Sequence, residues 1–248
     1  MKKFLAVVLA LAMVLAFAAC TKAPAADEQK EVLVMGTAAA FPPYEYTEAD
    51  GSIVGIDPEI AQAIADKLGM ELQIKDMEFD SLIAAVSGGS IDVVLAGMTV
   101  TEERLQSVNF STSYAKGVQS IIVPENSDIK TADDLKDHKI GVQAGTTGDI
   151  YCTDDFGQDN VKQFTNGSLA VEALNNGQVD CVVIDNEPAK NYVAANEGLK
   201  ILETAYTEED YAIAIAKGNE ELLQKVNKAL DELKADGTLD KIISKYIK

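Results

Sequence analysis

The sequence lacks tryptophan and has only one histidine among its 248 residues. This histidine, His138, lies in the charged segment 136–139, where we expect it to be solvated. Nucleophilic catalysis of the Ser-His or Cys-His kind therefore lacks its base. The sequence has no Cys/His cluster with metal spacing, no calcium-loop pattern and no phosphate-binding glycine loop. We expect no catalytic residues, no metal and no cofactor.

Basic residues are scarce. The chain has 21 Lys and Arg against 40 Asp and Glu, which gives a formal net charge of −19 at pH 7. Proteins bind nucleic acid largely by neutralising phosphates with Lys and Arg, so this balance argues against nucleic acid as a partner. It does not indicate a cationic ligand, because an acidic surface more often serves solubility.

The chain begins with a pattern typical of a secretory signal. Lys2 and Lys3 precede 16 apolar residues, 4–19, a run shorter than the about 20 that span a membrane. The tetrapeptide FAAC that ends at Cys20 resembles a lipobox, although the first position is usually Leu. We expect a signal peptide at 1–19, a lipid on Cys20 and a flexible tether at 20–31. Ordinary secretory cleavage beside an incidental cysteine is the alternative.

Two further cysteines, Cys152 and Cys181, lie in the segment that follows the expected tether. An extracytoplasmic compartment permits disulfides. Pairing depends on the distance between the two Cα atoms, which the sequence does not determine. A disulfide between Cys152 and Cys181 and two free thiols are therefore equal alternatives.

The remaining chain alternates between strand and helix patterns. From residue 32 onward the hydrophobic period switches between about 2 and about 3.6 residues, which predicts an α/β fold. Asp57-Pro58, for example, predicts the start of a helix with Asp57 as its N-cap. Ile60 and Ile64 then recur on one helical face. Residues 32–248 are long enough for one large domain or two modest domains.

Two segments form a weak internal repeat. Residues 89–95, GSIDVVL, align with residues 177–183, GQVDCVV, and each pair of helix and strand leads into a loop of small or polar residues. Two similar α/β halves would leave a cleft between them, and open parallel sheets bind ligands beyond their strand ends. Chance similarity of two such units is the alternative.

The polar loop 96–104, AGMTVTEER, carries groups suited to a free amino acid. Thr101 can cap a short helix, which would place Arg104 near the strand end in the expected cleft. A guanidinium binds a carboxylate through two parallel hydrogen bonds. Thr99 and the carbonyl of Gly97 could accept hydrogen bonds from an ammonium group. Taken alone, Arg104 is as compatible with an exposed position on a helix.

Several motifs occur together in one order. Residues 36–46, GTAAAFPPYEY, are followed by GID at 55–57, by the loop 96–104 and by VNFS at 108–111. This set resembles the polar amino-acid solute-binding proteins of bacterial ABC importers, also called solute-binding protein family 3. The resemblance covers essentially residues 32–248.

The resemblance implies a two-lobed α/β clamshell of the type II periplasmic-binding-protein kind, with two hinge crossings. Lobe 1 would comprise residues 32–114 plus 213–248, and lobe 2 residues 115–212. Closure would bury the ligand, and the closed form is what a permease would recognise.

The resemblance also implies contacts for the ligand's side chain and carboxylate. Phe41 and Phe79 would sandwich the side chain, although packing in the core is the alternative for both rings. Arg104 would bind the carboxylate. Thr147, at a helix N-terminus, would donate its backbone N–H to the same carboxylate.

For the α-ammonium group the resemblance implies Gly97, Thr99 and Asp185. A helix cap before Pro188 is the alternative role of Asp185. The full set of expected ligand-binding residues is Phe41, Phe79, Ala96, Gly97, Met98, Thr99, Arg104, Gln143, Thr146, Thr147, Gly148 and Asp185.

One position bears on the ligand's side chain. Family members that bind basic side chains usually have an acidic residue where this chain has Ala38. A buried cation without a carboxylate is costly. We therefore expect a small polar amino acid with a neutral side chain.

The expected function is the extracytoplasmic solute-binding component of an ABC importer, a monomer anchored to the cell membrane through Cys20. Its partners would be a free amino acid and the permease. An enzyme of the dehydratase type on the same scaffold is one rival, and aromatic product from prephenate or arogenate would reveal it. An amino-acid sensor lipoprotein is the other, and neighbouring permease genes would argue against it.

Overall fold

The computed structural model describes residues 30–203 and 206–247, and residues 31–248 form one compact unit. The expected signal peptide, Cys20 and nearly all of the expected tether lie outside the described residues. Within the described part of the chain, no helix is both long and apolar enough to cross a membrane.

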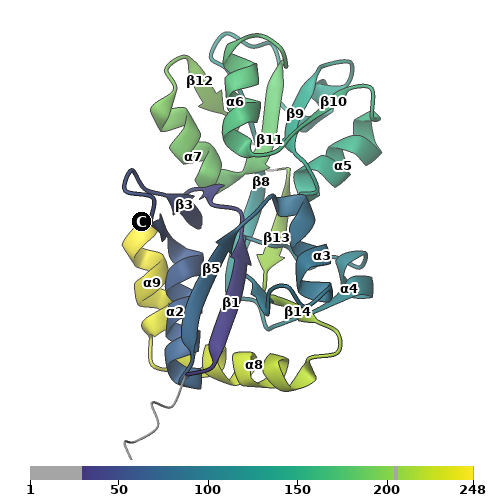
Figure 1. The fold of residues 1–248 in the computed structure, drawn as a ribbon. Helices are drawn as coiled ribbons and strands as arrows, with labels where there is room; N and C mark the ends of the chain where they lie inside the picture. The colour runs from purple at the N-terminus through teal and green to yellow at the C-terminus, as the bar shows by residue number, and fades with distance from the viewer. Residues whose placement is uncertain (1–29, 204–205, 248) are drawn as a thin grey trace, which may run out of the picture. The chain divides into compact units, whose positions relative to one another are not determined.

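The first sheet has five strands in the order β5-β1-β6-β14-β7 (Figure 1). Strand β1 pairs in parallel with β5 and β6, whereas β14 pairs antiparallel with β6 and β7. The strands are β1 (Val32–Thr37), β5 (Glu71–Asp76), β6 (Val93–Val94), β7 (Val108–Phe110) and β14 (Ala214–Ala216). Its helices are α2 (Ile56–Leu68), α3 (Leu82–Ser87) and α4 (Arg104–Ser107), with a 3-10 turn at Phe79–Ser81.

The second sheet has the order β10-β9-β11-β8-β12, and β13 pairs with β8 as a sixth strand. Its strands are β8 (Ala115–Pro124), β9 (Ile140–Gln143), β10 (Val161–Phe164), β11 (Cys181–Asp185), β12 (Leu199–Ile201) and β13 (Thr207–Tyr211). Its helices are α5 (Thr147–Phe156), α6 (Gly167–Asn175) and α7 (Asn186–Ala195), with a 3-10 turn at Ala132–Leu135. Strand β11 pairs in parallel with β9, just as β6 pairs with β1. The two repeat segments therefore occupy equivalent places in the two sheets.

A small third sheet lies beside the first. It consists of β2 (Ala40–Phe41), β3 (Glu45–Thr47) and β4 (Ile53–Val54), joined antiparallel. Gly55, which follows β4, has a positive φ of 131° and no room for a side chain, since an added Cβ would lie 2.2 Å from the carbonyl oxygen of Tyr44. This close approach fixes the segment that carries β3 against the start of α2.

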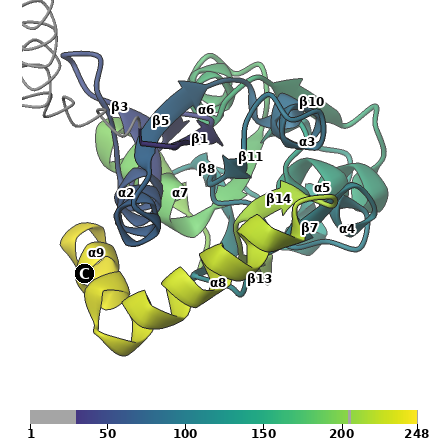
Figure 2. The same cartoon turned by 60° about the horizontal axis from the view of Figure 1, so that its bottom comes forward.

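The chain ends in two amphipathic helices, α8 (Glu220–Ala235) and α9 (Thr238–Tyr246), which pack against α2 (Figure 2). Asn219 caps α8, since its side chain accepts a hydrogen bond from the backbone N–H of Leu222 at 3.2 Å. Leu230 on α8 and Ile242 on α9 belong to the same hydrophobic cluster as Ile60 on α2. Burial of these apolar faces holds the C-terminal helices on the first sheet.

The start of α2 differs from the expectation. The helix begins at Ile56, so Asp57 is its second residue and not its N-cap, and the predicted cap was wrong. The Asp57 side chain is fully buried. It accepts hydrogen bonds from the backbone N–H of Gly97 at 2.9 Å and from the Tyr114 hydroxyl at 2.8 Å. The carboxylate thus joins α2 to the loop after β6 instead of capping its own helix.

Cys152 on α5 and Cys181 on β11 are free, buried thiols in one hydrophobic cluster. Of the two alternatives from the sequence, a disulfide or two free thiols, the structure therefore favours the free thiols. Burial is the main cause that raises the pKa of the Cys152 thiol to about 12. Neither thiol faces the cavity described below.

Candidate ligand-binding site

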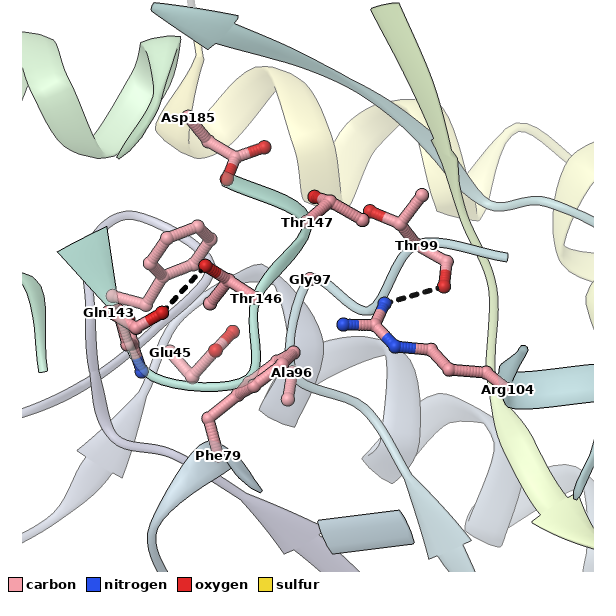
Figure 3. Close-up of a pocket in the computed structure, with 11 residues that line it drawn as sticks. Glu45, Phe79, Ala96, Gly97, Thr99, Arg104, Gln143, Thr146, Thr147 and Asp185 are labelled. Carbon is pink, nitrogen blue, oxygen red and sulfur yellow. Dashed lines mark hydrogen bonds between the residues drawn. The ribbon is translucent and has the colours of Figure 1, made fainter. Parts of the chain in front are cut away.

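One cavity is lined by segments of the two large sheets and of the small third sheet (Figure 3). Ten of the twelve residues expected from the sequence line it. The complete lining is Phe41, Glu45, Phe79, Ala96, Gly97, Thr99, Arg104, Gln143, Thr146, Thr147 and Asp185.

Arg104 is the first residue of α4, where the Thr101 hydroxyl accepts a hydrogen bond from its backbone N–H at 3.1 Å. Its buried guanidinium donates to the carbonyl of Thr99 at 2.7 Å and to the carbonyl of Gly145 at 3.0 Å. Burial lowers the pKa of Arg104, but a guanidinium stays charged in proteins. Its hydrogen-bond partners are neutral carbonyls, so a ligand carboxylate would be the anion in direct contact with the guanidinium.

Two aromatic rings form the apolar part of the cavity wall. The guanidinium carbon of Arg104 lies 5.4 Å from the centre of the Phe79 ring, within cation–π range. Phe41 stacks on Tyr44 with ring centres 5.9 Å apart. Gly97 packs close to Phe41, since a Cβ there would lie 2.8 Å from the ring. Both Phe41 and Phe79 are 7% exposed, so each ring packs into the core and also lines the cavity.

Asp185 ends β11, and its carboxylate points into the cavity region on another side from Arg104 (Figure 3). Although it occupies the N-cap position of α7, its side chain makes no capping hydrogen bond. It accepts a hydrogen bond from the Gln119 side-chain amide at 2.8 Å and another from the Tyr211 hydroxyl. Burial is the main cause that raises the pKa of Asp185 to about 7. A cationic partner would favour its ionised form.

The N-terminus of α5 forms a third part of the wall. Thr146 caps this helix, since its hydroxyl accepts a hydrogen bond from the backbone N–H of Asp149 at 3.3 Å. The Thr146 hydroxyl also donates to the carbonyl of Gln143 at 2.8 Å. Thr147 is the first helical residue and is buried at the cavity. A helix N-terminus favours an anion, so this end suits a ligand carboxylate.

Two expected residues, Met98 and Gly148, are not part of the cavity lining. The Met98 side chain is fully buried in a hydrophobic cluster with Phe79. Gly148 is the second residue of α5 and packs on the Gln119 side chain, whose Oε1 would lie 3.0 Å from an added Cβ. Both residues support the wall from behind. His138 likewise lies away from the cavity, with its Nδ1 3.5 Å from a carboxylate oxygen of Asp180.

Glu45 lines the cavity and was missed by the sequence analysis. It lies on β3, it is fully buried, and neither of its carboxyl oxygens accepts a hydrogen bond, although the protonated carboxyl can donate one to Asp57. Burial, followed by the charge of Asp57, raises the pKa of Glu45 well above its ordinary value. Burial also raises the pKa of Asp57 to about 6. Burial therefore favours the protonated form of Glu45, and a cation in the cavity would favour its ionised form.

A signal for Glu45 existed in the sequence. It is the only charged residue in the aromatic and apolar segment 36–47. A three-residue strand, however, does not tell which face is buried, because alternation needs a longer run.

An α/β fold of two mixed sheets, with one buried cavity that holds both an arginine and acidic groups, defines a two-lobed binding protein of the type II periplasmic class. The pattern of the bacterial extracellular solute-binding proteins, family 3, matches residues 33–248, and the chain belongs to this family. The resemblance stated from the sequence and the expected fold class are thereby confirmed. The family is one of transport binding proteins and not of enzymes, which removes the enzyme alternative.

Among its relatives, a probable histidine-binding protein of Neisseria gonorrhoeae is 36% identical over 99% of this chain and 96% of its own length. Among solved structures, an ancestral arginine-binding protein bound to arginine has a TM-score of 0.84 and 45% identity, covering 89% of this chain and all of its own. An ancestral arginine-binding protein bound to glutamine has a TM-score of 0.84 and 46% identity, covering 88% and 98%.

Proposed function

We propose that this protein captures a free amino acid between two lobes and delivers it to the permease of an ABC importer. The observation that carries the proposal is one buried cavity in which Arg104 and Asp185 supply opposite charges. The first can bind the ligand carboxylate, together with the N-terminus of α5, and the second the α-ammonium group. In this proposal Thr99 and the carbonyl of Gly97 accept the remaining ammonium hydrogens.

We assign residues 32–114 and 213–248 to lobe 1 and residues 115–212 to lobe 2. Sheet pairing supports this division, because the strands of the first sheet lie within the first two segments and those of the second sheet within the third. The crossings would lie at the start of β8 and between β13 and β14. Hydrogen bonds from Arg104 to the carbonyl of Gly145, at 3.0 Å, and from the Tyr192 hydroxyl to the carbonyl of Ala40, at 2.6 Å, would then join the lobes in a closed form.

Two residues, Ala38 and Glu45, lead to different predictions for the ligand's side chain. Ala38 led to the prediction of a neutral side chain, and that prediction stays untested. Glu45 favours a cationic side chain, because its buried oxygens accept no hydrogen bond and Phe41 and Phe79 lie on the same cavity. A guanidinium can pair with the carboxylate and stack on both rings. We therefore propose a basic amino acid, with L-arginine as the first candidate and L-glutamine as the neutral alternative.

We also propose where the protein lies in the cell and what it docks on. A lipid on Cys20 would hold the protein at the outer face of the cell membrane, where a monomer would dock on the permease. An amino-acid sensor role would use the same cavity and the same closure. Uptake of the bound amino acid by vesicles that contain the permease would separate the two roles.

Proton release should accompany ligand binding and should depend on the side chain. In the ligand-free protein burial raises the pKa of Asp185 to about 7 and raises that of Glu45 well above its ordinary value. A ligand ammonium lowers the pKa of Asp185, and a guanidinium lowers that of Glu45. At pH 6 the Asp185 carboxyl is largely protonated before binding, and burial favours the protonated form of Glu45. L-Arginine should therefore release up to about one proton more than L-glutamine.

Titration calorimetry in buffers of different ionisation enthalpy measures this release. At pH 8.5 Asp185 is already ionised, and the proton released by L-glutamine should largely disappear. Glu48→Gln is the matched control. Glu48 is exposed and directly follows β3, so its substitution should leave the number of released protons unchanged. Equal release with both amino acids would contradict the role of Glu45, and failure of every amino acid to bind would contradict the proposed function.

A further inference from the structure

Glu209 is a buried acidic residue that does not line the cavity. It lies on β13, where it pairs with Gly117 of β8. The loop after β6 runs along the same strand, since Thr99 forms a β-bridge with Tyr211 and the backbone N–H of Val100 donates to the carbonyl of Asp210 at 3.1 Å. Glu209 is therefore held directly behind the loop that supplies Thr99.

We call the residues proposed to bind the ligand's α-ammonium group, Gly97, Thr99 and Asp185, the amino-group site. The Glu209 carboxylate contacts Thr99 directly and Asp185 through Gln119. Its Oε2 accepts a hydrogen bond from the Thr99 hydroxyl at 3.0 Å and one from the Gln119 side-chain amide at 3.0 Å. The same Gln119 nitrogen donates to Asp185 at 2.8 Å. The other Glu209 oxygen, Oε1, is buried and accepts no close hydrogen bond among the described residues, and the Tyr151 hydroxyl is a further neighbour of the carboxylate. Burial lowers the pKa of Arg104, and the negative charge of Glu209 opposes this effect by raising it.

These hydrogen bonds set the direction of the Thr99 hydroxyl. A hydroxyl has one hydrogen to donate and two lone pairs that accept. Because a carboxylate can only accept, the Thr99 hydrogen must point to Glu209, and its lone pairs stay free toward the cavity. An ammonium group has only donors, so it needs such a free lone pair. In the same way, Gln119 turns its amide nitrogen toward both carboxylates and holds the side chain of Asp185.

We propose that Glu209 is a positioning residue of the amino-group site, which acts through Thr99 and Gln119 to present acceptors to the ligand's α-ammonium. The inference rests on the proposed function and adds to it a residue that selects for a charged α-amino group. Glu209 also keeps a negative charge close to the ammonium without touching it. A ligand that lacks the amino group gains nothing from this arrangement.

The substitution Glu209→Gln tests the role with little change in shape. A glutamine can donate to Thr99 and so reverse its hydroxyl, and it removes the charge. The affinity for the amino acid that the wild type binds most tightly, expected to be L-arginine, should fall about tenfold, the loss of one hydrogen bond to a charged group. Affinity for its desamino analogue, 5-guanidinopentanoate for L-arginine, should stay within threefold. Glu208→Gln, an exposed neighbour on β13, is the matched control and should bind as the wild type does.

A double-mutant cycle decides whether Glu209 acts through Thr99. Thr99→Val removes the hydroxyl and keeps the shape, and by itself it should also cost about tenfold in affinity. If Glu209 acts through that hydroxyl, the double variant should bind within about threefold of Thr99→Val alone. Three results would each overturn the inference while the proposed function stands. The affinity losses of the two single variants could multiply in the double variant, the desamino analogue could lose as much affinity as the amino acid, or Glu209→Gln could bind the amino acid within threefold of wild type. A wild type that binds no amino acid would overturn both.

Discussion

Arg104→Ala should weaken amino-acid binding by about 10²–10³, which corresponds to roughly 3–5 kcal/mol for a buried charge that loses its partner. Arg104 is the only arginine in the chain, and its guanidinium is buried with two backbone carbonyls as its hydrogen-bond partners. When the cavity closes on a ligand, an alanine would leave the ligand carboxylate without its main donor. Titration calorimetry of the variant against the wild type measures the loss.

Two further variants show whether the effect is specific to the guanidinium. Arg104→Lys should recover only part of the affinity, because an ammonium cannot donate two parallel hydrogen bonds to one carboxylate. Leu105→Ala changes an exposed residue of the same helix and should bind as the wild type does. If Arg104→Ala binds within threefold of wild type, the carboxylate is held elsewhere and the proposed pocket is wrong.

Glu45→Gln should weaken the binding of L-arginine by a similar factor of about 10²–10³, because the ligand's guanidinium would be buried without a carboxylate. L-Glutamine should bind the variant within about threefold of its affinity for wild type, since its side chain carries no charge. The ligand-free variant should keep the stability of the wild type, because a glutamine amide can donate to Asp57 in place of the protonated Glu45 carboxyl. Calorimetry and thermal unfolding of the same samples measure both quantities.

The matched control for this substitution is again Glu48→Gln, which should bind both amino acids as the wild type does. A Glu45→Gln variant that loses L-glutamine as strongly as L-arginine would show a structural role of Glu45 beside Asp57 and not a role in recognition. A variant that keeps full affinity for L-arginine would restore the prediction of a neutral side chain from Ala38.

The loop that carries Arg104 could be predicted from sequence because its information is local. Thr101 was predicted to cap a short helix, and its hydroxyl accepts the expected hydrogen bond from the Arg104 backbone N–H, although α4 begins only at Arg104 with Glu103 at its N-cap position. The position of this loop after a buried strand predicts its place at a sheet edge. The alternation of strands and helices in the same way predicted the α/β class, which the structure confirms.

Glu45 and Asp57 could not be predicted, because their environment is created by segments far apart in the chain. Asp57 has the sequence signature of a helix cap, yet Gly97 and Tyr114, 40 and 57 residues later, supply its hydrogen bonds. Glu45 is buried because β3 packs beside α2, a contact that no period in a three-residue strand reveals. The Glu209 contacts likewise join residues 110 and 90 positions apart.

The most direct test of capture is a thermal-unfolding screen of the full protein against each of the twenty amino acids. A ligand that binds only the folded state raises the free energy of unfolding by RT ln(1 + [L]/Kd), about 2.7 kcal/mol at a hundredfold excess over Kd. We predict that L-arginine gives the largest upward shift in the unfolding temperature and that Arg104→Ala removes most of it. No shift with any of the twenty amino acids would contradict amino-acid capture, and a larger shift with L-glutamine would contradict the cationic side chain alone.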